Sequence, residues 1–219
     1  GTIATMKQEF PEVDVIANSI NRGCAGGRNQ GLEYGIGRGY DYVQFLDDDM
    51  VVGQDFIGKI LDGFKCDIKV GISVATLCYY DTPSIVYSGG GIFKFKEGFL
   101  TTHKMDNVKV VKHLPCENSQ WAFGGASCID TRIFNDVGYL DENMGAIGGE
   151  DYDYSLRVRK AGYSICWVPS AIIYHKGFQT PGMADTTSNE KIYAGYRNVA
   201  RVYRNNYGLA KYLIAIYYI

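Results

Sequence analysis

Three consecutive aspartates, Asp47 to Asp49, end a run of strand-forming residues. Side chains two residues apart in an extended chain point the same way, so we expect Asp47 and Asp49 to converge while Asp48 points elsewhere. Like charges held together repel unless a cation or a donor-rich ligand compensates them. Two converging carboxylates with open coordination positions suit Mg²⁺ or Mn²⁺ bridged to substrate phosphates. A solvated acidic turn is the alternative interpretation.

A glycine-rich turn, residues 21–31, precedes the aspartates and opens a predicted helix. Its glycines allow a ligand to approach the backbone closely, and a helix N-terminus favours an anion. Arg28 adds a forked donor suited to a diphosphate. The spacing matches neither a dinucleotide-binding fingerprint nor a P-loop, so taken alone the segment also fits an ordinary tight turn.

Two further candidates lie in the second half of the chain. Glu150 and Asp151 begin a predicted helix, where the macrodipole stabilises carboxylates, but a carboxylate at a cleft mouth also suits a general base. His175 ends a predicted apolar strand, as the aspartates end theirs, and this placement fits a third metal ligand. A structural histidine is the alternative for His175.

Strands and helices must alternate to bring these side chains together. In the first third of the chain we expect helices over residues 2–10, 28–38 and 55–64 and strands over 13–17, 41–46 and 70–76. Such alternation predicts parallel βαβ units, whose ligands bind at the carboxyl ends of the strands. Further along we expect a hairpin or bent strand pair at 85–95, a strand from 121, helices at 131–137, 149–162 and 187–207, and two strands split by Pro169.

Composition limits the classes of function. The chain has 219 residues, enough for one large domain, and 22 basic against 24 acidic residues give a net charge of -2. That balance gives no electrostatic footprint for nucleic acid. Six cysteines lie far apart without a CxxC pair, which predicts buried free thiols in a reducing cytosol rather than disulfides or a zinc site.

In their order along the chain, these features resemble the inverting family-2 glycosyltransferases of GT-A fold. The resemblance covers residues 1 to about 205, and the ordered set makes the acidic-turn interpretation a minor one. Its segments are Asn21-x-Gly23, Gly26-Gly27-Arg28-Asn29-x-Gly31, FLDDDMVV, Trp121 with Gly124-Gly125-Ala126, Val137-Gly138-x-Leu140-Asp141-Glu142, Gly149-Glu150-Asp151-x-Asp153, Leu156-Arg157-x-Arg159-x-Ala161-Gly162, Val168-Pro169-x-Ala171, His175 and Tyr196-Arg197-Asn198.

The resemblance implies a role for each matching residue. A divalent cation, Mg²⁺ or Mn²⁺, would be held by Asp49, Asp47 and His175. Asp151 would be the catalytic base, with Glu150 beside it. The donor would contact Asn21, Gly23, Arg28, Asn29, Asp47 and Asp48. The acceptor would contact Trp121, Gly124 and Gly125, although a core tryptophan is the alternative for Trp121.

The resemblance also implies the architecture and the reaction. We expect a mostly parallel sheet flanked by helices, with a small antiparallel element in the acceptor half and the first βα unit missing at a truncated N-terminus. Residues 1–207 would form the catalytic domain, followed by an apolar segment at 208–219. That segment is too short to span a bilayer, which takes about 20 residues, and favours either peripheral membrane contact or docking on the core.

The expected reaction moves a sugar, with inversion, from a nucleotide-sugar donor to a glycan or lipid-linked glycan in surface polysaccharide or glycolipid synthesis. The pattern is similar to that of bacterial rhamnosyl- and galactofuranosyl-transferases, and we expect a cytoplasmic location at the inner face of the membrane. Two alternatives stay open: a catalytically silent carbohydrate- or nucleotide-binding domain on the same scaffold, and a nucleotidyltransferase. The second does not explain Glu150, Asp151 or His175.

Overall fold

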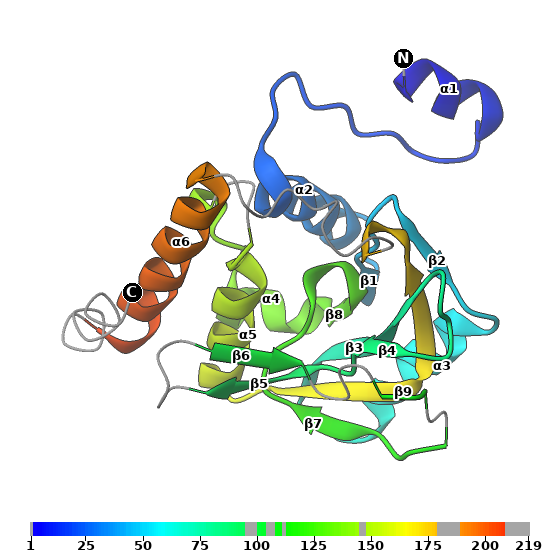
Figure 1. The fold of residues 1–219 in the computed structure, drawn as a ribbon. Helices are drawn as coiled ribbons and strands as arrows, with labels where there is room; N and C mark the ends of the chain where they lie inside the picture. The colour runs from blue at the N-terminus through cyan, green and yellow to red at the C-terminus, as the bar shows by residue number, and fades with distance from the viewer. Residues whose placement is uncertain are drawn as a thin grey trace.

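The computed structural model describes residues 2–94, 100–103, 108–110, 113–144, 148–178 and 189–208 (Figure 1). Its strands are β1 Tyr42–Gln44, β2 Met50–Val52, β3 Val70–Tyr79, β4 Val86–Ser88, β5 Gly91–Lys94, β6 Leu100–His103, β7 Glu117–Ser119, β8 Ser127–Asp130 and β9 Ser164–His175. Its α-helices are α1 Thr2–Glu9, α2 Gly23–Gly37, α3 Phe56–Asp62, α4 Phe134–Val137, α5 Glu150–Lys160 and α6 Asn189–Tyr207. Short 3₁₀ turns include Gly63–Lys65 (η1) and Gly124–Ala126 (η2).

A central sheet carries the order β1-β8-β3-β9-β2, with β4 added to β3 and β7 added to β9. The α/β class is therefore confirmed, and β5 and β6 form the expected small antiparallel element. The pairing is more mixed than predicted. Only β3 and β9 pair in parallel among the described strands, because β8 inserts antiparallel between β1 and β3, and β2 returns antiparallel along β9.

The predicted pair of strands around Pro169 is one strand, β9, in the structure. Its register against β3 jumps between Ala75↔Val168 and Thr76↔Ile172, so residues 169–171 bulge out of the ladder. A bulge tolerates proline because no ladder donor is needed there. The hydroxyl of Thr76 donates to the Pro169 carbonyl at 3.2 Å and holds the bulge in place. The strand therefore continues to His175 at its far end.

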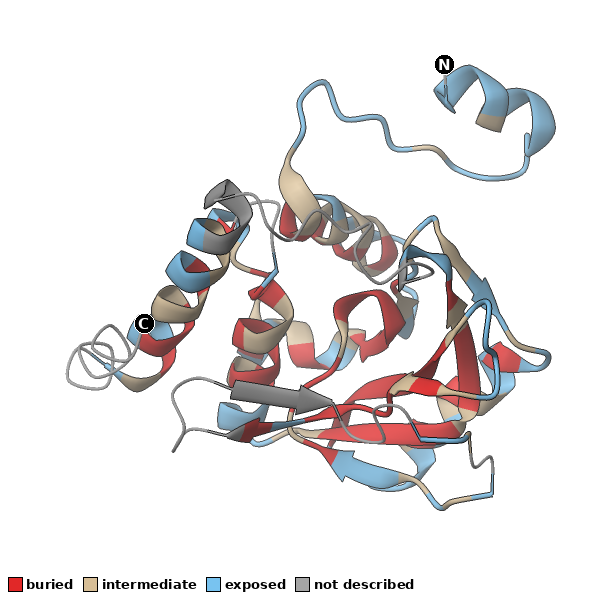
Figure 2. Cartoon of the chain, in the orientation of Figure 1, coloured by how far each residue is buried: buried red, intermediate tan, exposed pale blue. Residues whose placement is uncertain are grey.

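The strand predicted at residues 13–17 is absent. These residues extend without a ladder partner, and the segment between α1 and α2 runs mostly exposed over the surface, as Figure 2 shows in pale blue. Helix α1 forms as expected but buries none of its side chains. An apolar alternating run forms a strand only when another strand pairs with it, which explains the wrong prediction.

Glycines determine the structure of two other predicted strand regions. Of the hairpin or bent strand pair expected at 85–95, the structure shows the bent pair: β4 pairs with β3 and β5 pairs with β6, on either side of Gly90, whose φ is 76°. The strand expected from Trp121 begins only at Ser127, because the η2 turn intervenes. Left-handed Gly39, Gly162 and Gly208 follow α2, α5 and α6, where a positive φ ends a helix.

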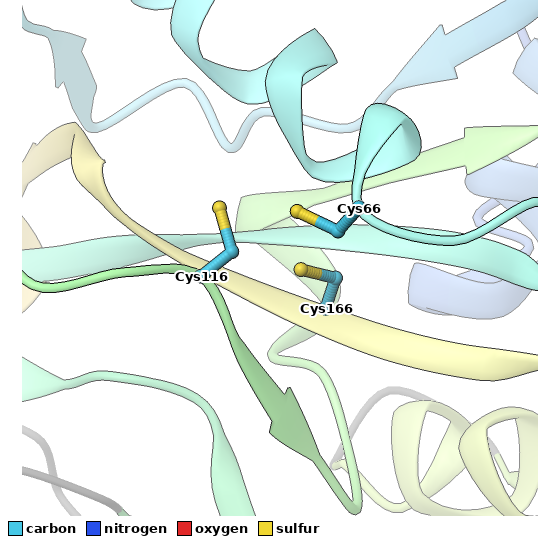
Figure 3. Close-up of side chains that lie close together, drawn as sticks. All are labelled: Cys66, Cys116 and Cys166. Carbon is cyan, nitrogen blue, oxygen red and sulfur yellow. The ribbon is translucent and has the colours of Figure 1, made fainter.

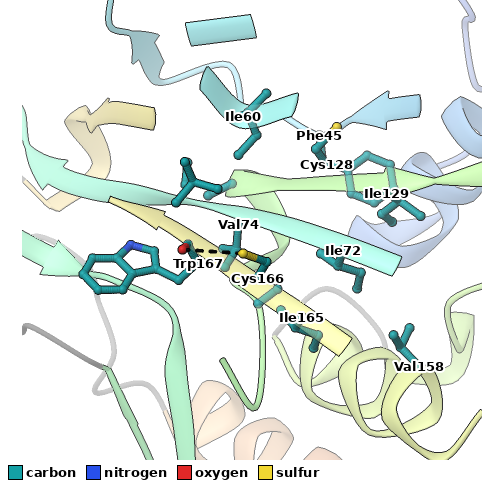
Figure 4. Packing of buried hydrophobic residues seen from close by; sticks show 14 of the residues in the cluster. Phe45, Ile60, Ile72, Val74, Cys128, Ile129, Val158, Ile165, Cys166 and Trp167 are labelled. Carbon is teal, nitrogen blue, oxygen red and sulfur yellow. Dashed lines mark hydrogen bonds between the residues drawn. The ribbon is translucent and has the colours of Figure 1, made fainter. Parts of the chain in front are cut away.

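The core lies where β3 and β9 run side by side, between the helix that carries Ile60 and the helix that carries Val158 (Figure 4). Nine of the ten residues of β3 are buried, which accounts for its mostly apolar sequence. Helix α3 packs on β9 and β3, and α5 packs on β9 and α6. Within the described residues no helix is both long and apolar enough to cross a membrane. The apolar residues 209–219 lie outside the described part.

Candidate active site

Asp47, Asp49 and His175 come together at one edge of the sheet. One ligand atom from each lies within 4.8 Å of the others, and His175 Nε2 lies 3.0 Å from Asp49 Oδ1. The convergence of Asp47 and Asp49 is confirmed, and Asp48 is exposed and outside the group. Two carboxylates and one imidazole form a donor set that fits a divalent cation such as Mn²⁺ or Mg²⁺.

The local backbone explains this meeting. The aspartates form a turn closed by a hydrogen bond from the Met50 amide to the Asp47 carbonyl, at 3.1 Å, rather than the extended segment we expected. Strand β2 then pairs with the end of β9, with Met50 opposite His175. The Lys176 amide donates to the Asp49 carbonyl at 2.9 Å, which fixes the turn against the strand that carries His175.

Arg28, on α2, connects this trio to the start of α5. One terminal nitrogen donates to Asp47 Oδ1 at 3.1 Å and the other to Glu150 Oε1 at 2.8 Å. The Arg28 and Glu150 side chains are only 11% and 5% exposed. A buried ion pair of this kind fixes geometry, since removing either partner leaves an uncompensated charge. A contact between Arg28 and a diphosphate stays a prediction, because both terminal nitrogens already have carboxylate partners.

Gly124 and Gly125 allow the backbone to approach this network. A Cβ atom on Gly124 would collide with the Arg28 guanidinium, and one on Gly125 would collide with the Asp47 carboxylate and lie 2.7 Å from Met50 Cε. The structure thus places Gly124 against Arg28 and Gly125 against Asp47. Their assignment to an acceptor stays a prediction without a contact that supports it.

Asp151 occupies the second position of α5, next to Glu150. Burial, together with the nearby charge of Glu150, raises the pKa of Asp151 to about 7, although Arg28 and backbone amides of Tyr152 and Gly124 oppose the shift. The Asp151 side chain is partly accessible and lines a small cavity with Phe45 and Gly124. A carboxylate with a pKa near neutrality suits a general base.

The residues predicted to contact the donor have different surroundings in the structure. Asn29 is buried, and its amide group exchanges two hydrogen bonds with the Leu140 backbone, at 3.0 and 2.9 Å, and donates to Glu142 at 3.0 Å. These contacts hold Asn29 against the Leu140 backbone, and donor contact by Asn29 stays a prediction. Asn21 accepts from the Gly23 amide at 2.8 Å in an exposed turn at the start of α2, and donor contact by Asn21 and Gly23 also stays a prediction.

Trp121 does not offer a face to an acceptor. Its side chain is fully buried in a cluster with Phe93, Met144 and Leu156. The ring packs edge-on against Tyr152 with 5.0 Å between centroids. The core interpretation of Trp121 is therefore correct, because the chain folds β5 and α5 over this ring.

Sequence reasoning missed two positions that organise the site. Asn198, on α6, donates to the carbonyls of Met144 and Gly148 at 2.6 and 2.7 Å and so holds both ends of the segment that leads into α5. A Cβ atom on Gly177 would lie 2.5 Å from Asp49 Oδ2 and 3.2 Å from the His175 ring. The position of Gly177 two residues after His175 was the available signal, and Asn198 was noted only as part of the resemblance.

Residues 42–216 match the family described as Glycosyl transferase family group 2. The chain belongs to this family. Polypeptide N-acetylgalactosaminyltransferase 11 of Xenopus tropicalis is 27% identical over 199 residues, which cover 83% of this chain and 31% of that protein. Poly-beta-1,6-N-acetyl-D-glucosamine synthase of Staphylococcus aureus (strain COL) is 27% identical over 162 residues, covering 70% of this chain and 34% of that protein. The chain thus spans about a third of the length of these relatives.

Among solved structures, the crystal structure of GalNAc-T7 with UDP, GalNAc and Mn²⁺ is similar, with a TM-score of 0.69 and 17% sequence identity. The similarity covers 93% of this chain and 38% of that chain. At this level of identity the likeness concerns the fold, and it confirms the expected GT-A architecture of the family-2 glycosyltransferase chain.

Proposed function

We propose that this protein transfers a sugar from a nucleotide-sugar donor to an acceptor hydroxyl with inversion at the anomeric carbon. One observation carries the proposal: Arg28 joins Asp47 of the metal-ligand trio to Glu150, the neighbour of Asp151. A cation site and a general base are thereby held in a single rigid arrangement. Transfer of a sugar from a diphosphate needs both, because one group leaves with negative charge while the attacking hydroxyl loses a proton.

Asp47, Asp49 and His175 are the residues that would hold the divalent cation. When bound, such a cation neutralises charge on the departing nucleoside diphosphate. The close approach of Gly125 and Gly177 to these ligands leaves no room for larger side chains and keeps the carboxylates aimed together.

Asp151 would take the proton from the acceptor hydroxyl, and the oxygen would attack the anomeric carbon from the face opposite the leaving diphosphate. One displacement of this kind inverts the configuration. Cys24 lies beside the same network, but burial raises its pKa to about 12, so it remains a thiol and a poor nucleophile. Cys24 is therefore not the nucleophile of a covalent intermediate.

The catalytic domain is proposed to extend over residues 1–207, with 208–219 as an apolar segment. The two curated relatives are named for N-acetylhexosamine chemistry, so N-acetylhexosamine donors belong beside rhamnose and galactofuranose donors in a test. We propose a glycan or lipid-linked glycan acceptor in surface polysaccharide or glycolipid synthesis, at the cytoplasmic face of a membrane.

The test uses the full-length protein and a panel of nucleotide sugars with Mn²⁺, Mg²⁺ or chelator. We expect metal-dependent release of a nucleoside diphosphate that Asp151→Asn reduces by about 10² to 10⁴-fold. The anomeric configuration of the product, measured by NMR, tests inversion. Binding of donor without turnover would instead support a silent binding domain, and wild-type turnover by Asp151→Asn would overturn the base assignment.

A further inference from the structure

Three cysteines from distant parts of the chain meet near the start of β9, whereas the candidate active site lies at its end. Cys66 follows η1, Cys116 precedes β7, and Cys166 lies in β9. Their sulfur atoms all lie within 4.8 Å of one another, and Figure 3 shows them gathered between the three segments. All three are free thiols as expected, but the expected burial holds only for Cys166, because Cys66 is exposed and Cys116 is half-buried.

The fold holds these thiols in place through backbone pairing. Strand β7 pairs with β9 so that Asn118 lies opposite Cys166, which brings the preceding Cys116 to the same place. The η1 turn packs on β9, and the Cys66 thiol lies 3.6 Å from the Asp62 carbonyl. Each thiol is therefore fixed by a different element, and the cluster exists without any ligand to assemble it.

We propose that Cys66, Cys116 and Cys166 form a thiolate site for a zinc-like cation, with the fourth position open to solvent beside exposed Cys66. Zinc bound by thiolates at about 2.3 Å in a tetrahedron separates the sulfurs by roughly 3.8 Å. The observed limit of 4.8 Å requires the sulfurs to close by no more than about 1 Å. Thiolate ligands select soft and borderline metals over Mg²⁺, which separates this site from the carboxylate trio.

Binding would exchange protons for the metal. Burial, with help from Cys66, raises the pKa of Cys116 to about 11, and burial also raises the pKa of Cys166, so both are thiols without a cation. One Zn²⁺ entering the site displaces three protons and leaves a complex of net charge -1, with water completing the tetrahedron. No oxidant is needed, in contrast to a disulfide between two of these residues.

The site lies apart from the candidate active site along β9. Cys166 and His175 lie opposite Ser73 and Tyr79 of β3, which are six residues apart, a separation of roughly 20 Å along a strand. A cation bound by the cysteines is too distant to touch a sugar donor at Asp49. Instead it would tie η1 and the edge strand β7 to β9, the strand that ends in the candidate active site.

The test is titration of the reduced full-length protein, kept free of oxygen, with Co²⁺. We expect a thiolate-to-cobalt charge-transfer band that Zn²⁺ abolishes by displacement, with three protons released per metal. The band should disappear in Cys66→Ser, an exposed position whose replacement leaves the core intact. It should persist in Cys24→Ser, which removes a thiol outside the cluster, and in Asp49→Asn, which disables the oxygen-rich site.

A second measurement guards against misfolding. Zn²⁺ should protect Cys66 and Cys116 from alkylation, read by peptide mass spectrometry, and should raise the Tm of the wild type but not of Cys66→Ser. The proposal is overturned if no charge-transfer band forms, if the band survives Cys66→Ser, or if air oxidation yields a disulfide among the three residues while the reduced protein binds no cobalt.

Discussion

Arg28 donates to Glu150 at 2.8 Å across 122 positions of sequence, and this buried contact joins the helix after the glycine-rich turn to the helix that carries Asp151. The same guanidinium reaches Asp47 and lies 5.7 Å from the centre of the Phe45 ring. Stacking and forked donation together use the planar shape of arginine, which lysine lacks. The candidate base and the candidate metal ligands therefore share one positively charged connector.

Replacing Arg28 by Gln should destabilise the fold by about 3–5 kcal/mol, because Glu150 would keep a buried charge without a partner. Chemical denaturation measures the change. Adding Glu150→Gln to the Arg28 variant should recover part of the loss, since the orphaned charge is then removed. Arg22→Ala provides the control: its ion pair with Glu142 is far more exposed, so its loss should cost less than about 1 kcal/mol. Equal effects at both arginines would contradict the connector role.

Turnover should increase with pH through about 7, since the base works only when Asp151 has lost its proton. A plot of kcat/KM against pH should show one rising limb of unit slope. A profile that is flat between pH 5.5 and 8.5 would show that Asp151 does not titrate in the rate-determining step.

Asp151 should also make the free energy of unfolding depend on pH. Its pKa is raised in the folded state above the value near 3.9 of an unfolded aspartate, so folding favours the protonated form. The benefit is complete below about pH 4 and is lost as the pH rises to about 7. Asp151→Asn should therefore be more stable than the wild type at pH 8 by up to about 4 kcal/mol, with the difference vanishing near pH 4. Thermal melts at the two pH values check the sign.

Adjacent aspartates allow a matched test of the cation site. Asp49→Asn should weaken Mn²⁺ binding at least 10-fold, which corresponds to about 1.4 kcal/mol, because Asp49 belongs to the converging trio. Asp48→Asn removes the same charge one residue away at an exposed position and should change the affinity far less. Mn²⁺ titration followed by electron paramagnetic resonance measures both, and equal losses would favour a diffuse acidic surface.

Alanine at Gly125 should displace the Asp47 carboxylate and weaken Mn²⁺ binding, and alanine at Gly124 should displace the Arg28 guanidinium. Gly31→Ala is the control, because no atom lies within 4 Å of the added Cβ and the residue lies inside α2. There the change should stabilise the protein by about 0.5–1 kcal/mol through helix propensity. Metal titration and denaturation separate the two classes of glycine.

The local sequence pattern predicted the strands and helices that carry the site. Which strands pair with one another depends on long-range contacts that the local pattern does not reveal. A buried strand such as β3 can be recognised from its mostly apolar sequence. The convergence of Asp47, Asp49 and His175 could be predicted because all three residues follow or end predicted strands. The strand expected at 13–17 failed because alternation reveals a suitable surface but not the partner strand.

Contacts between side chains that are far apart in the chain could not be predicted from the sequence. Nothing local to Arg28 indicates Glu150 as its partner, and nothing local to Cys66 indicates two other thiols fifty and a hundred positions away. Trp121 shows the same limit, since an aromatic side chain before a glycine turn suits both a sugar-binding surface and a core, and burial decides between them.

Two neighbouring side chains of helix α2 contact different distant parts of the chain. Arg28 faces the site and Glu150, while Asn29 faces the Leu140 backbone 111 positions away. During divergence, a change at either position therefore exposes a distant partner, and a lineage that loses the arginine should also lose the glutamate. Among homologues, positions 28 and 150 should covary as a pair, whereas position 29 should be nearly invariant because its partner is a backbone that substitution cannot alter.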